Sequence, residues 1–360
     1  MFFQPFLGPY RIDLSNDLSL SFDTRLYLRR NASKGQGFDH DKSLDKLAFT
    51  PILLPVGSLH ILKFLSQEFK SFRPDIVIAF EFDLITLFFV ILKVLNHGSF
   101  KLVGMSDDSF DMILGRDFTL KHRIGRRLLT PFLDEIIVVE PDAEKWYQDQ
   151  YKIGFFFPII RDEQIVRMNY SQAISLQDSL IADYGLEHTF TFLYVGRLVK
   201  IKNIQSLIRA FSHLEQTKNI LIVVGDGPEE ERLKALALER SANVVFTGRL
   251  TGNQLDVWYT LADALVLPSI VEPFGAVTNE ALMGGCYGIV SKTAGSKCLI
   301  SDGVNGFVFD PFDENELTQK LEGVRHLSTE PVSSRKLRAS KMILSYPEMI
   351  HRLFSRLDTL

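Results

Sequence analysis

Cysteine is scarce in this chain, which has only Cys286 and Cys298 among its 360 residues. Two cysteines exclude a disulfide framework, and neither has metal-site spacing to histidine, so we expect a reducing, cytoplasmic compartment. An excess of one charge is also absent, because 40 Lys and Arg face 44 Asp and Glu for a net charge of -4. This balance excludes general nucleic-acid binding through a basic surface, and any anion must be bound by local groups.

Long hydrophobic runs are lacking as well. The longest, residues 84–92, ends at Lys93 and is far shorter than the roughly 20 residues that cross a bilayer, so it predicts a buried helix. No secretory signal pattern is expected at the N-terminus, because it has no basic segment followed by a small-residue cleavage site. What is present is an ordinary globular composition, 46% hydrophobic and 23% charged, over a length that predicts two domains with separate cores.

The second half of the chain alternates short β-branched runs with helical patterns. Strands are predicted at residues 190–195, 220–224, 244–247, 264–267, 288–291 and 306–309. Helices are predicted at 204–214, 229–237, 253–262, 276–283 and 314–321, with a helical turn at 297–300. This alternation indicates a Rossmann-like α/β domain, in which a parallel sheet is covered by helices on both faces.

The first half repeats the same alternation less clearly. Strands are predicted at residues 2–6, 24–28, 76–80, 102–105 and 136–139, and helices at 60–69, 84–95 and 124–133. We therefore predict a Rossmann-like N-terminal domain (1–160), a polar linker (161–188), a C-terminal domain (189–345) and a final helix (346–360). Apolar residues recur at helical spacing in that final segment, so we expect it to pack back on the N-terminal domain.

A basic loop, Gly-Arg-Leu-Val-Lys-Ile-Lys-Asn at residues 196–203, follows the strand predicted at 190–195. Ligands of parallel sheets bind at the carboxyl ends of strands, where helix N-termini offer N–H groups to anions. Cations at a helix start oppose the helix dipole unless an anion lies between them. Arg197 and Lys202 therefore favour a bound phosphate, although this motif alone fits solvated loop charges equally well.

A second motif, Glu-Pro-Phe-Gly-Ala-Val-Thr-Asn-Glu at residues 272–280, follows a later predicted strand. Pro273 disfavours helix at Glu272, so Glu272 is expected on a loop and Glu280 inside the next helix. Free N–H groups near Ala276 and Val277 would bind a phosphate, which the carboxylates would repel at contact distance. The two glutamates should instead accept hydrogen bonds from hydroxyls at the two ends of the ligand, and this describes a nucleotide sugar.

Together with Gly-Asp-Gly-Pro at 225–228, Val-Phe-Thr-Gly at 245–248 and Pro268-Ser269, these motifs resemble family 4 retaining glycosyltransferases of the GT-B fold, also called glycosyl transferases group 1. The resemblance is strong over about residues 189–325 and extends to the first half only in layout. It implies an α/β GT-B architecture with two Rossmann-like domains facing across a cleft. It also implies a nucleotide-sugar donor, no metal cofactor, a glycan or lipid-linked glycan acceptor, and a role in bacterial surface-polysaccharide synthesis.

The resemblance further implies roles for individual residues. Arg197 and Lys202 would hold the donor diphosphate, Glu280 the ribose, and Glu272 the donor sugar near its reacting carbon, which makes Glu272, Arg197 and Lys202 the implied catalytic residues. The implied donor-binding set is Gly196, Arg197, Lys202, Thr247, Gly248, Arg249, Leu250, Glu272, Phe274, Gly275, Ala276, Val277, Thr278 and Glu280. Anomeric configuration would be retained through front-face attack, in which the leaving phosphate helps to deprotonate the acceptor and no protein nucleophile is required.

Three positions depart from the pattern of the family. Asn203 stands where a Gly is usual, Tyr287 where Pro is frequent, and Cys298 where Glu is often found. These positions flank the nucleotide and sugar pocket, so they leave the reaction class intact and the identity of the donor open.

On the acceptor side we select four residues. Tyr10 and Arg11 belong to a Pro-Tyr-Arg loop that resembles a variant in some bacterial members, and Arg11 would face a phosphate or form a structural salt bridge. Asp107 and Asp108 follow a predicted strand, where a general base could face the ligand, but capping of the next helix is the slightly favoured alternative.

Two other features point to a metal and to a membrane. Asp39-His40-Asp41 matches the Asp-x-Asp signature of metal-dependent glycosyltransferases, yet its Gly- and Lys-rich surroundings predict a solvated loop, so no metal site is expected. Residues 116–132 form a basic amphipathic pattern, which suits an anionic membrane surface or, more often, a domain helix with a solvated face. A peripheral position on the inner face of the membrane is therefore one option for this cytoplasmic protein.

The leading hypothesis is a metal-independent retaining glycosyltransferase. A GT-B nucleotide-sugar epimerase or phosphorylase is the alternative enzyme, because a fold does not fix a reaction. A non-catalytic nucleotide-sugar-binding protein is the third hypothesis, and the joint presence of Glu272, Glu280, Arg197 and Lys202 argues against it.

Overall fold

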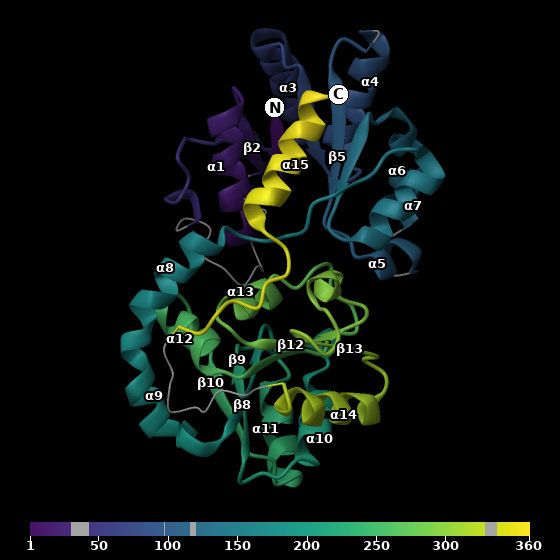
Figure 1. Ribbon diagram of the computed structural model, residues 1–360. Coiled ribbons are helices and arrows are strands. Elements are labelled where there is room, and N and C mark those ends of the chain that lie inside the picture. Colours follow the sequence, from purple (N-terminus) through teal and green to yellow (C-terminus); the bar gives the residue numbers. More distant parts are fainter. Residues whose placement is uncertain (30–42, 97, 116–119, 328–336) are drawn as a thin grey trace. The chain divides into compact units, whose positions relative to one another are not determined.

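The computed structural model describes residues 1–29, 43–96, 98–115, 120–327 and 337–360 (Figure 1). The chain divides into two compact units. Unit 1 consists of Met1–Arg161 together with Pro347–Leu360, and unit 2 consists of Asp162–Tyr346. Each unit is built around its own parallel sheet, as the alternation of strand and helix patterns predicts.

Unit 1 contains a seven-stranded sheet in the order β3-β2-β1-β4-β5-β6-β7. The strands are β1 (Phe2–Gln4), β2 (Leu26–Arg29), β3 (Ile52–Leu54), β4 (Ile76–Phe80), β5 (Lys101–Ser106), β6 (Glu135–Val138) and β7 (Phe155–Phe156). The helices are α1 (Ile12–Ser21), α3 (Ser58–Phe72), α4 (Leu84–Leu95), α5 (Phe110–Leu114), α6 (Leu120–Leu129) and α7 (Pro141–Tyr151), with short 3-10 turns η1 (Pro9–Arg11) and η2 (Thr130–Phe132).

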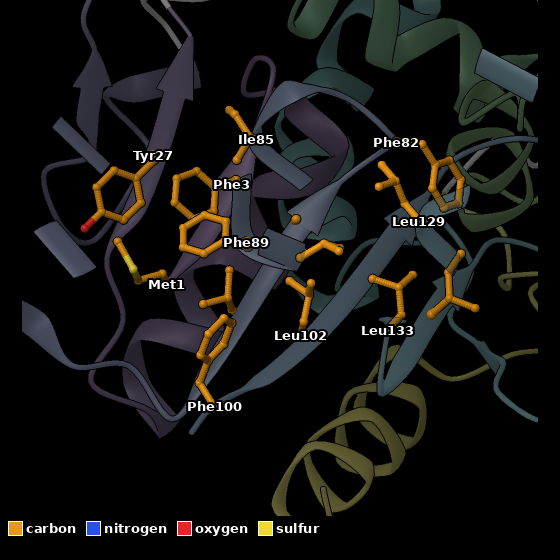
Figure 2. Close-up of a cluster of buried hydrophobic side chains, with 14 of the residues drawn as sticks. Met1, Phe3, Tyr27, Phe82, Ile85, Phe89, Phe100, Leu102, Leu129 and Leu133 are labelled. Atoms are coloured by element: carbon orange, nitrogen blue, oxygen red, sulfur yellow. The ribbon is translucent and has the colours of Figure 1, made fainter. Parts of the chain in front are cut away.

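The core of unit 1 lies between its sheet and helices that include α4, and Figure 2 shows many of its side chains. Phe3 and Tyr27 stack with ring centroids 4.6 Å apart, and Phe89 of α4 packs 5.2 Å from Phe3. Helix α4 begins where the Asp83 carboxylate accepts hydrogen bonds from the N–H groups of Ile85 and Thr86. The apolar run predicted as a buried helix is buried on one face only, because Leu87, Ile91, Val94 and Leu95 are exposed.

Unit 2 contains a six-stranded parallel sheet in the order β10-β9-β8-β11-β12-β13. The strands are β8 (Phe190–Val195), β9 (Asn219–Val224), β10 (Val244–Gly248), β11 (Ala264–Leu267), β12 (Tyr287–Ser291) and β13 (Gly306–Phe309). The helices are α8 (Glu163–Ala173), α9 (Gln177–Tyr184), α10 (Ile204–Ser212), α11 (Glu230–Glu239), α12 (Asn253–Leu261), α13 (Val277–Met283) and α14 (Glu314–Arg325). The 3-10 turns are η3 (Ile174–Leu176), η4 (Leu186–His188), η5 (Lys200–Lys202) and η6 (Gly295–Leu299).

The structure differs from the predicted linker at residues 161–188. Residues 163–184 are largely helical and belong to unit 2, and Val166, Tyr170 and Ala173 of α8 are buried in its core. The apolar stripe of α8 is narrow, with polar residues on the rest of the helix, which explains why the sequence reads as polar and weakly patterned. The chain passes from one unit to the other at Arg161 and Asp162 instead.

The final helix, α15 (Tyr346–Asp358), packs on unit 1. Phe354 meets Phe22 edge to face with ring centroids 5.3 Å apart, and the Arg356 guanidinium donates to the buried Glu135 carboxylate at 2.6 Å. Figure 1 shows this helix in front of the first sheet, near α1. Among the described residues, no helix is long and apolar enough to cross a bilayer.

Candidate active site

The two donor motifs lie at the same edge of the second sheet. The basic loop follows β8, and the segment from Glu272 to Glu280 follows β11, the neighbouring strand. The carboxyl ends of parallel strands meet at one edge, so residues 70 positions apart in sequence come together. The topology therefore gathers the predicted donor residues without any local sequence pattern linking them.

The basic loop is supported by the loop that follows β9. The backbone of Gly225 has φ +146°, and a Cβ added there would overlap the carbonyl oxygen of Gly196. The N–H of Leu198 donates to the carbonyl of Asp226 at 2.7 Å. The two loops thus pack backbone against backbone, and a glycine is required at position 225 for this approach.

Lys202 and Glu272 form an ion pair between the two motifs. The Glu272 carboxylate also accepts a hydrogen bond from the Ser269 hydroxyl at 3.0 Å, and Glu272 is only 7% exposed. The N–H of Ile270 donates to the carbonyl of Ile201 at 2.8 Å, which ties the loop backbones together beside the pair. The structure therefore places an ammonium and a carboxylate, both implied to contact the donor, in direct contact.

The turn after Lys202 explains one departure from the family pattern. Asn203 has φ +54°, a left-handed conformation that Asn tolerates better than most residues and that glycine adopts without strain. Its side-chain amide donates to the carbonyl of Pro311 at 2.9 Å. Asn203 thus does the conformational work of the usual glycine and adds an anchor to the rest of unit 2.

Arg197 is exposed, and its side chain forms no ion pair with the residues that the structure describes. Its backbone carbonyl accepts a hydrogen bond from the hydroxyl of the buried Tyr194 at 3.0 Å. Burial and the nearby Glu272 carboxylate raise the pKa of Tyr194, so the phenol remains a proton donor. Tyr194 was missed by sequence reasoning, because it reads as an ordinary core position of a strand.

The turn into α13 is fixed by Gly275, which has φ +93°. A Cβ at this position would lie 2.5 Å from Leu267 Cδ2, so a larger residue would disturb the turn. Thr278 and Ser296 share a hydroxyl hydrogen bond at 2.9 Å, and the N–H of Ser296 donates to the carbonyl of the buried Phe274 at 2.8 Å. The Gly275–Thr278 segment, which belongs to the implied donor-binding set, is therefore anchored to η6.

Glu280 has partners on two other helices. The hydroxyl of Tyr259 on α12 donates to Glu280 Oε2 at 2.7 Å, and that of Tyr170 on α8 donates to the Glu280 carbonyl at 2.9 Å. Burial raises the pKa of Tyr259 well above its usual value, with the Glu280 carboxylate adding to the shift. Sequence reasoning missed both tyrosines, and Tyr170 lies in the segment predicted as a linker.

The other implied donor residues lie at the end of β10, on the outer edge of the sheet. The Thr247 hydroxyl is hydrogen-bonded to the carbonyl of Gly248 at 3.0 Å. Arg249 is exposed and Leu250 is half-buried. The donor-binding role that the resemblance implies for them stays a prediction.

The acceptor-side residues of unit 1 form a buried polar group. Arg11 is 3% exposed and is ion-paired with Asp107, so it forms the structural salt bridge that was the alternative to phosphate contact. Tyr10 lies half-buried in η1. The capping alternative for Asp107 and Asp108 is wrong, because the side chain of Ser109 accepts the hydrogen bond at the start of α5.

Asp108 is engaged inside unit 1. Its carboxylate accepts a hydrogen bond from the Ser106 hydroxyl at 2.8 Å and lies 3.4 Å from His122 Nε2. Burial raises the pKa of the neighbouring Asp107 carboxyl, and the Arg11 guanidinium opposes that shift. His122 was missed because nothing in the sequence near it points to a site.

Some of the residues considered for a metal site and for a membrane surface lie outside the residues that the structure describes. Asp39 and Asp41 are among them. Among the described residues, no group of three or more His, Cys, Asp or Glu is arranged to hold a metal ion. Residues 116–119 also lie outside, and α6 begins at Leu120. Arg126, expected on the basic face of this helix, is instead 5% exposed, whereas Arg123 and Arg127 are exposed.

Known proteins resemble this chain mainly through unit 2. The family model described as Glycosyl transferases group 1 matches residues 177–338. The uncharacterized glycosyltransferase MJ1607 of Methanocaldococcus jannaschii is 31% identical over 161 residues, which is 44% of this chain and 39% of that protein. Several curated relatives are similarly longer than the matched segment, so the chain spans well under half of their length.

Two comparisons extend over both units. An uncharacterized 41.2 kDa protein in the cps region of Klebsiella pneumoniae is 28% identical over 307 residues, covering 74% of this chain and 83% of that protein. The crystal structure of HepE from Anabaena in complex with UDP superposes with a TM-score of 0.75 at 18% identity, covering 100% of this chain and 99% of that chain. This chain therefore has the predicted GT-B fold of two Rossmann-like domains, and residues 177–338 of its C-terminal unit match the family model of the glycosyl transferases group 1.

Proposed function

We propose that this protein is a retaining glycosyltransferase that moves a sugar from a nucleotide-sugar donor to a hydroxyl of a glycan or lipid-linked glycan. The observation that carries the proposal is the joining of Lys202 and Glu272 beside the exposed Arg197, at one edge of the second sheet. Cations next to a carboxylate suit a ligand with a diphosphate at one point and sugar hydroxyls at another. The HepE structure contains UDP, which supports a nucleotide as part of the ligand.

Donor binding redistributes the contacts of this pair. We infer that Lys202 turns toward the diphosphate together with Arg197, and that Glu272 then accepts hydrogen bonds from hydroxyls of the donor sugar. Glu280 accepts from the ribose, held in place by the Tyr259 hydroxyl. The Ser269 hydrogen bond keeps the Glu272 carboxylate in position when its ammonium partner turns to the ligand.

The transfer step follows from these roles. The acceptor oxygen bonds to the anomeric carbon on the face occupied by the leaving group, and the bond from that carbon to the diphosphate oxygen breaks. The electron pair of the broken bond and the acceptor proton both go to the departing diphosphate oxygen, so anomeric configuration is retained. Arg197 and Lys202 stabilise the negative charge that develops there.

These two cations also bear on cofactor use. They offset charge on the leaving diphosphate, so we propose that no metal cofactor is required. Activity should persist in EDTA; its loss on chelation and its return with Mn²⁺ or Mg²⁺ would contradict this and would make Asp39 and Asp41 the first residues to examine.

We propose that the protein binds peripherally to the cytoplasmic face of a membrane through a surface formed by α6 and α4. Helix α6 exposes Ile124 and Leu128 beside Arg123 and Arg127, and it packs near α4. The exposed residues of α4 extend the apolar surface, namely Leu84, Leu87, Ile91, Val94 and Leu95. An apolar face with cations beside it suits the surface of an anionic bilayer, where a lipid-linked acceptor would be located.

The test is a panel of UDP, GDP, dTDP and ADP sugars measured by thermal shift. A donor at about 100 times its dissociation constant should stabilise the folded state by about 2.7 kcal/mol, and the stabilising donor is then assayed for transfer to glycan acceptors. Conversion of that donor without any acceptor would favour an epimerase, and dependence on inorganic phosphate would favour a phosphorylase. Stabilisation by no member of the panel would contradict the proposal.

A further inference from the structure

Tyr194 carries a polar group at a core position where an apolar ring would pack equally well. It lies on β8, on the same face of the strand as Phe190 and Phe192, because side chains two residues apart share a face. Phe192 and Tyr194 belong to one core cluster, and both are fully buried. The ring therefore packs as the phenylalanines do. The hydroxyl needs a separate explanation, since burying a polar group costs free energy unless it is hydrogen-bonded.

The Tyr194 hydroxyl is directed at the basic loop. It donates to the Arg197 carbonyl at 3.0 Å, and a Cβ added to Gly196 would lie 2.8 Å from the hydroxyl oxygen. The main chain of the loop therefore passes directly over the phenol. Because burial and the Glu272 carboxylate raise the pKa of Tyr194, the hydroxyl keeps its proton and remains a donor to this carbonyl at neutral pH.

The Arg197 carbonyl begins a hydrogen-bonded turn that ends at Lys202. The N–H of Val199 donates to this carbonyl at 3.1 Å, and the N–H of Lys202 donates to the Val199 carbonyl at 3.0 Å. The phenol adds a side-chain donor to the same carbonyl. It therefore holds, from inside the core, the residue from which the exposed Arg197 guanidinium extends.

Other contacts hold the residues on either side of Arg197. The N–H of Gly196 donates to the Val224 carbonyl at 3.0 Å, and Leu198 is buried and joined to the Asp226 carbonyl through its own N–H. The loop is thus anchored before and after Arg197, and the phenol acts on the residue between these anchors. Removing the hydroxyl should leave the loop in place and loosen the main chain at Arg197.

We propose that Tyr194 is a positioning residue for the leaving group: its hydroxyl holds the Arg197 main chain so that the guanidinium lies where negative charge develops on the departing diphosphate. This inference rests on the proposed function, since it concerns the same donor site. A cation stabilises developing charge best when it needs no reorganisation during the reaction. An exposed arginine side chain has many rotamers, so a fixed main chain limits the positions that its guanidinium can take.

The test is a double-mutant cycle on the full chain, measured by calorimetric titration of UDP, GDP, dTDP and ADP. These nucleoside diphosphates carry the phosphate charge of the departing group. The cycle consists of the wild type, Tyr194→Phe, Arg197→Ala and the double variant. Tyr27→Phe is the matched control, because Tyr27 is a fully buried tyrosine of β2 in unit 1 whose hydroxyl donates to Glu68 at 2.8 Å. Urea unfolding of each variant establishes that it is folded before titration.

We expect Tyr194→Phe to raise the Kd of the nucleoside diphosphate that binds the wild type by about three- to tenfold, which is a part of the loss expected for Arg197→Ala. In the Arg197→Ala background the same change should alter the Kd by less than about twofold, because the group that the phenol positions is gone. Tyr27→Phe should leave the Kd unchanged.

The outcomes separate this inference from the proposed function. An unchanged Kd in Tyr194→Phe, or an equal loss with and without Arg197, would overturn the inference and leave the proposed function standing. A loss of the same size in Tyr27→Phe would also overturn the inference, since it would show a general effect of removing a buried hydroxyl. Binding of none of the four nucleoside diphosphates to the wild type would contradict the proposed function and the inference together.

Discussion

Replacing Lys202 or Arg197 by alanine should separate an effect on folding stability from an effect on donor binding. Both residues are proposed to bind the donor, but they differ in burial and in ion pairing. Lys202 is paired with Glu272, and the two side chains are 16% and 10% exposed. Lys202→Ala therefore leaves a nearly buried carboxylate with Ser269 as its remaining hydrogen-bond donor among the contacts described above. Arg197→Ala removes an exposed cation from a loop whose position depends on its backbone.

The magnitudes follow from this difference in burial. Breaking a buried ion pair by removing one partner costs about 3 to 5 kcal/mol, and we take about 3 because some solvent reaches this pair. For a unit the size of unit 2, about 3 kcal/mol lowers Tm by roughly 6–12 °C. Arg197→Ala should change the free energy of unfolding by no more than about 0.5 kcal/mol, as is usual for exposed positions.

Binding of the nucleoside diphosphate should fall in both variants. Each loses a charge-assisted hydrogen bond worth about 1.5–3 kcal/mol, or roughly 10- to 100-fold in Kd. The double variant Lys202→Ala with Glu272→Gln should recover much of the lost stability, since a neutral amide replaces the unpaired carboxylate. It should not recover the affinity.

The assay combines calorimetric titration with unfolding of the ligand-free protein by heat and by urea. Equal stability of Lys202→Ala and Arg197→Ala would show that the ion pair contributes nothing to folding. Failure of Glu272→Gln to restore stability would show that the loss comes from the lysine stem rather than from an unpaired charge. Unchanged nucleotide affinity in both single variants would remove the proposed phosphate contacts.

Three further predictions concern other parts of the chain. Tyr259→Phe should weaken nucleotide binding severalfold, because Glu280 loses the 2.7 Å hydrogen bond that orients it, and unchanged calorimetric affinity would contradict this. The double variant Arg123→Glu and Arg127→Glu should abolish sedimentation with anionic vesicles at low salt, since each cation near the surface contributes about 1 kcal/mol; equal sedimentation of variant and wild type would refute it. Burial raises the pKa of the Cys286 thiol to about 11, so in the folded protein this thiol stays protonated at mildly alkaline pH. Cys286 should therefore resist iodoacetamide until unfolding returns its pKa to about 8.5, and mass spectrometry distinguishes its labelling from that of the half-buried Cys298. Rapid labelling of Cys286 in the folded chain at mildly alkaline pH would contradict its assigned burial.

The strands of unit 2 were predictable because their residues are β-branched or aromatic and end at Gly, Pro or Asp. Phe190–Val195, Ala264–Leu267 and Gly306–Phe309 have the predicted bounds, and the other three predicted strands of unit 2 differ by one residue at an end. In unit 1 the strands Ile52–Leu54 and Phe155–Phe156 were missed, because two or three residues at a sheet edge carry almost no periodic signal. Their place is set by pairing with neighbouring strands.

The candidate site was predictable as a set of residues but not as a set of contacts. The sequence motifs identify Lys202 and Glu272 separately, whereas their ion pair depends on β8 and β11 being neighbours. Arg126 shows that a sequence pattern can also predict the wrong exposure. Its place on an apparently basic helix face predicts an exposed side chain, whereas tertiary packing buries it. Reversal of all three arginines of α6 would therefore place a glutamate in the interior, which is why the vesicle experiment uses only two.

The backbone contact between Gly225 and Gly196 has a consequence for engineering and for comparing relatives. The loops after β8 and β9 contact each other through their main chains, so the Gly-Asp-Gly-Pro segment determines the position of the basic loop. Neither loop can therefore be exchanged alone. A chimera that imports residues 196–203 from a relative should work only if residues 225–228 come from the same parent. Natural variation at position 225 should likewise be accompanied by changes in the basic loop.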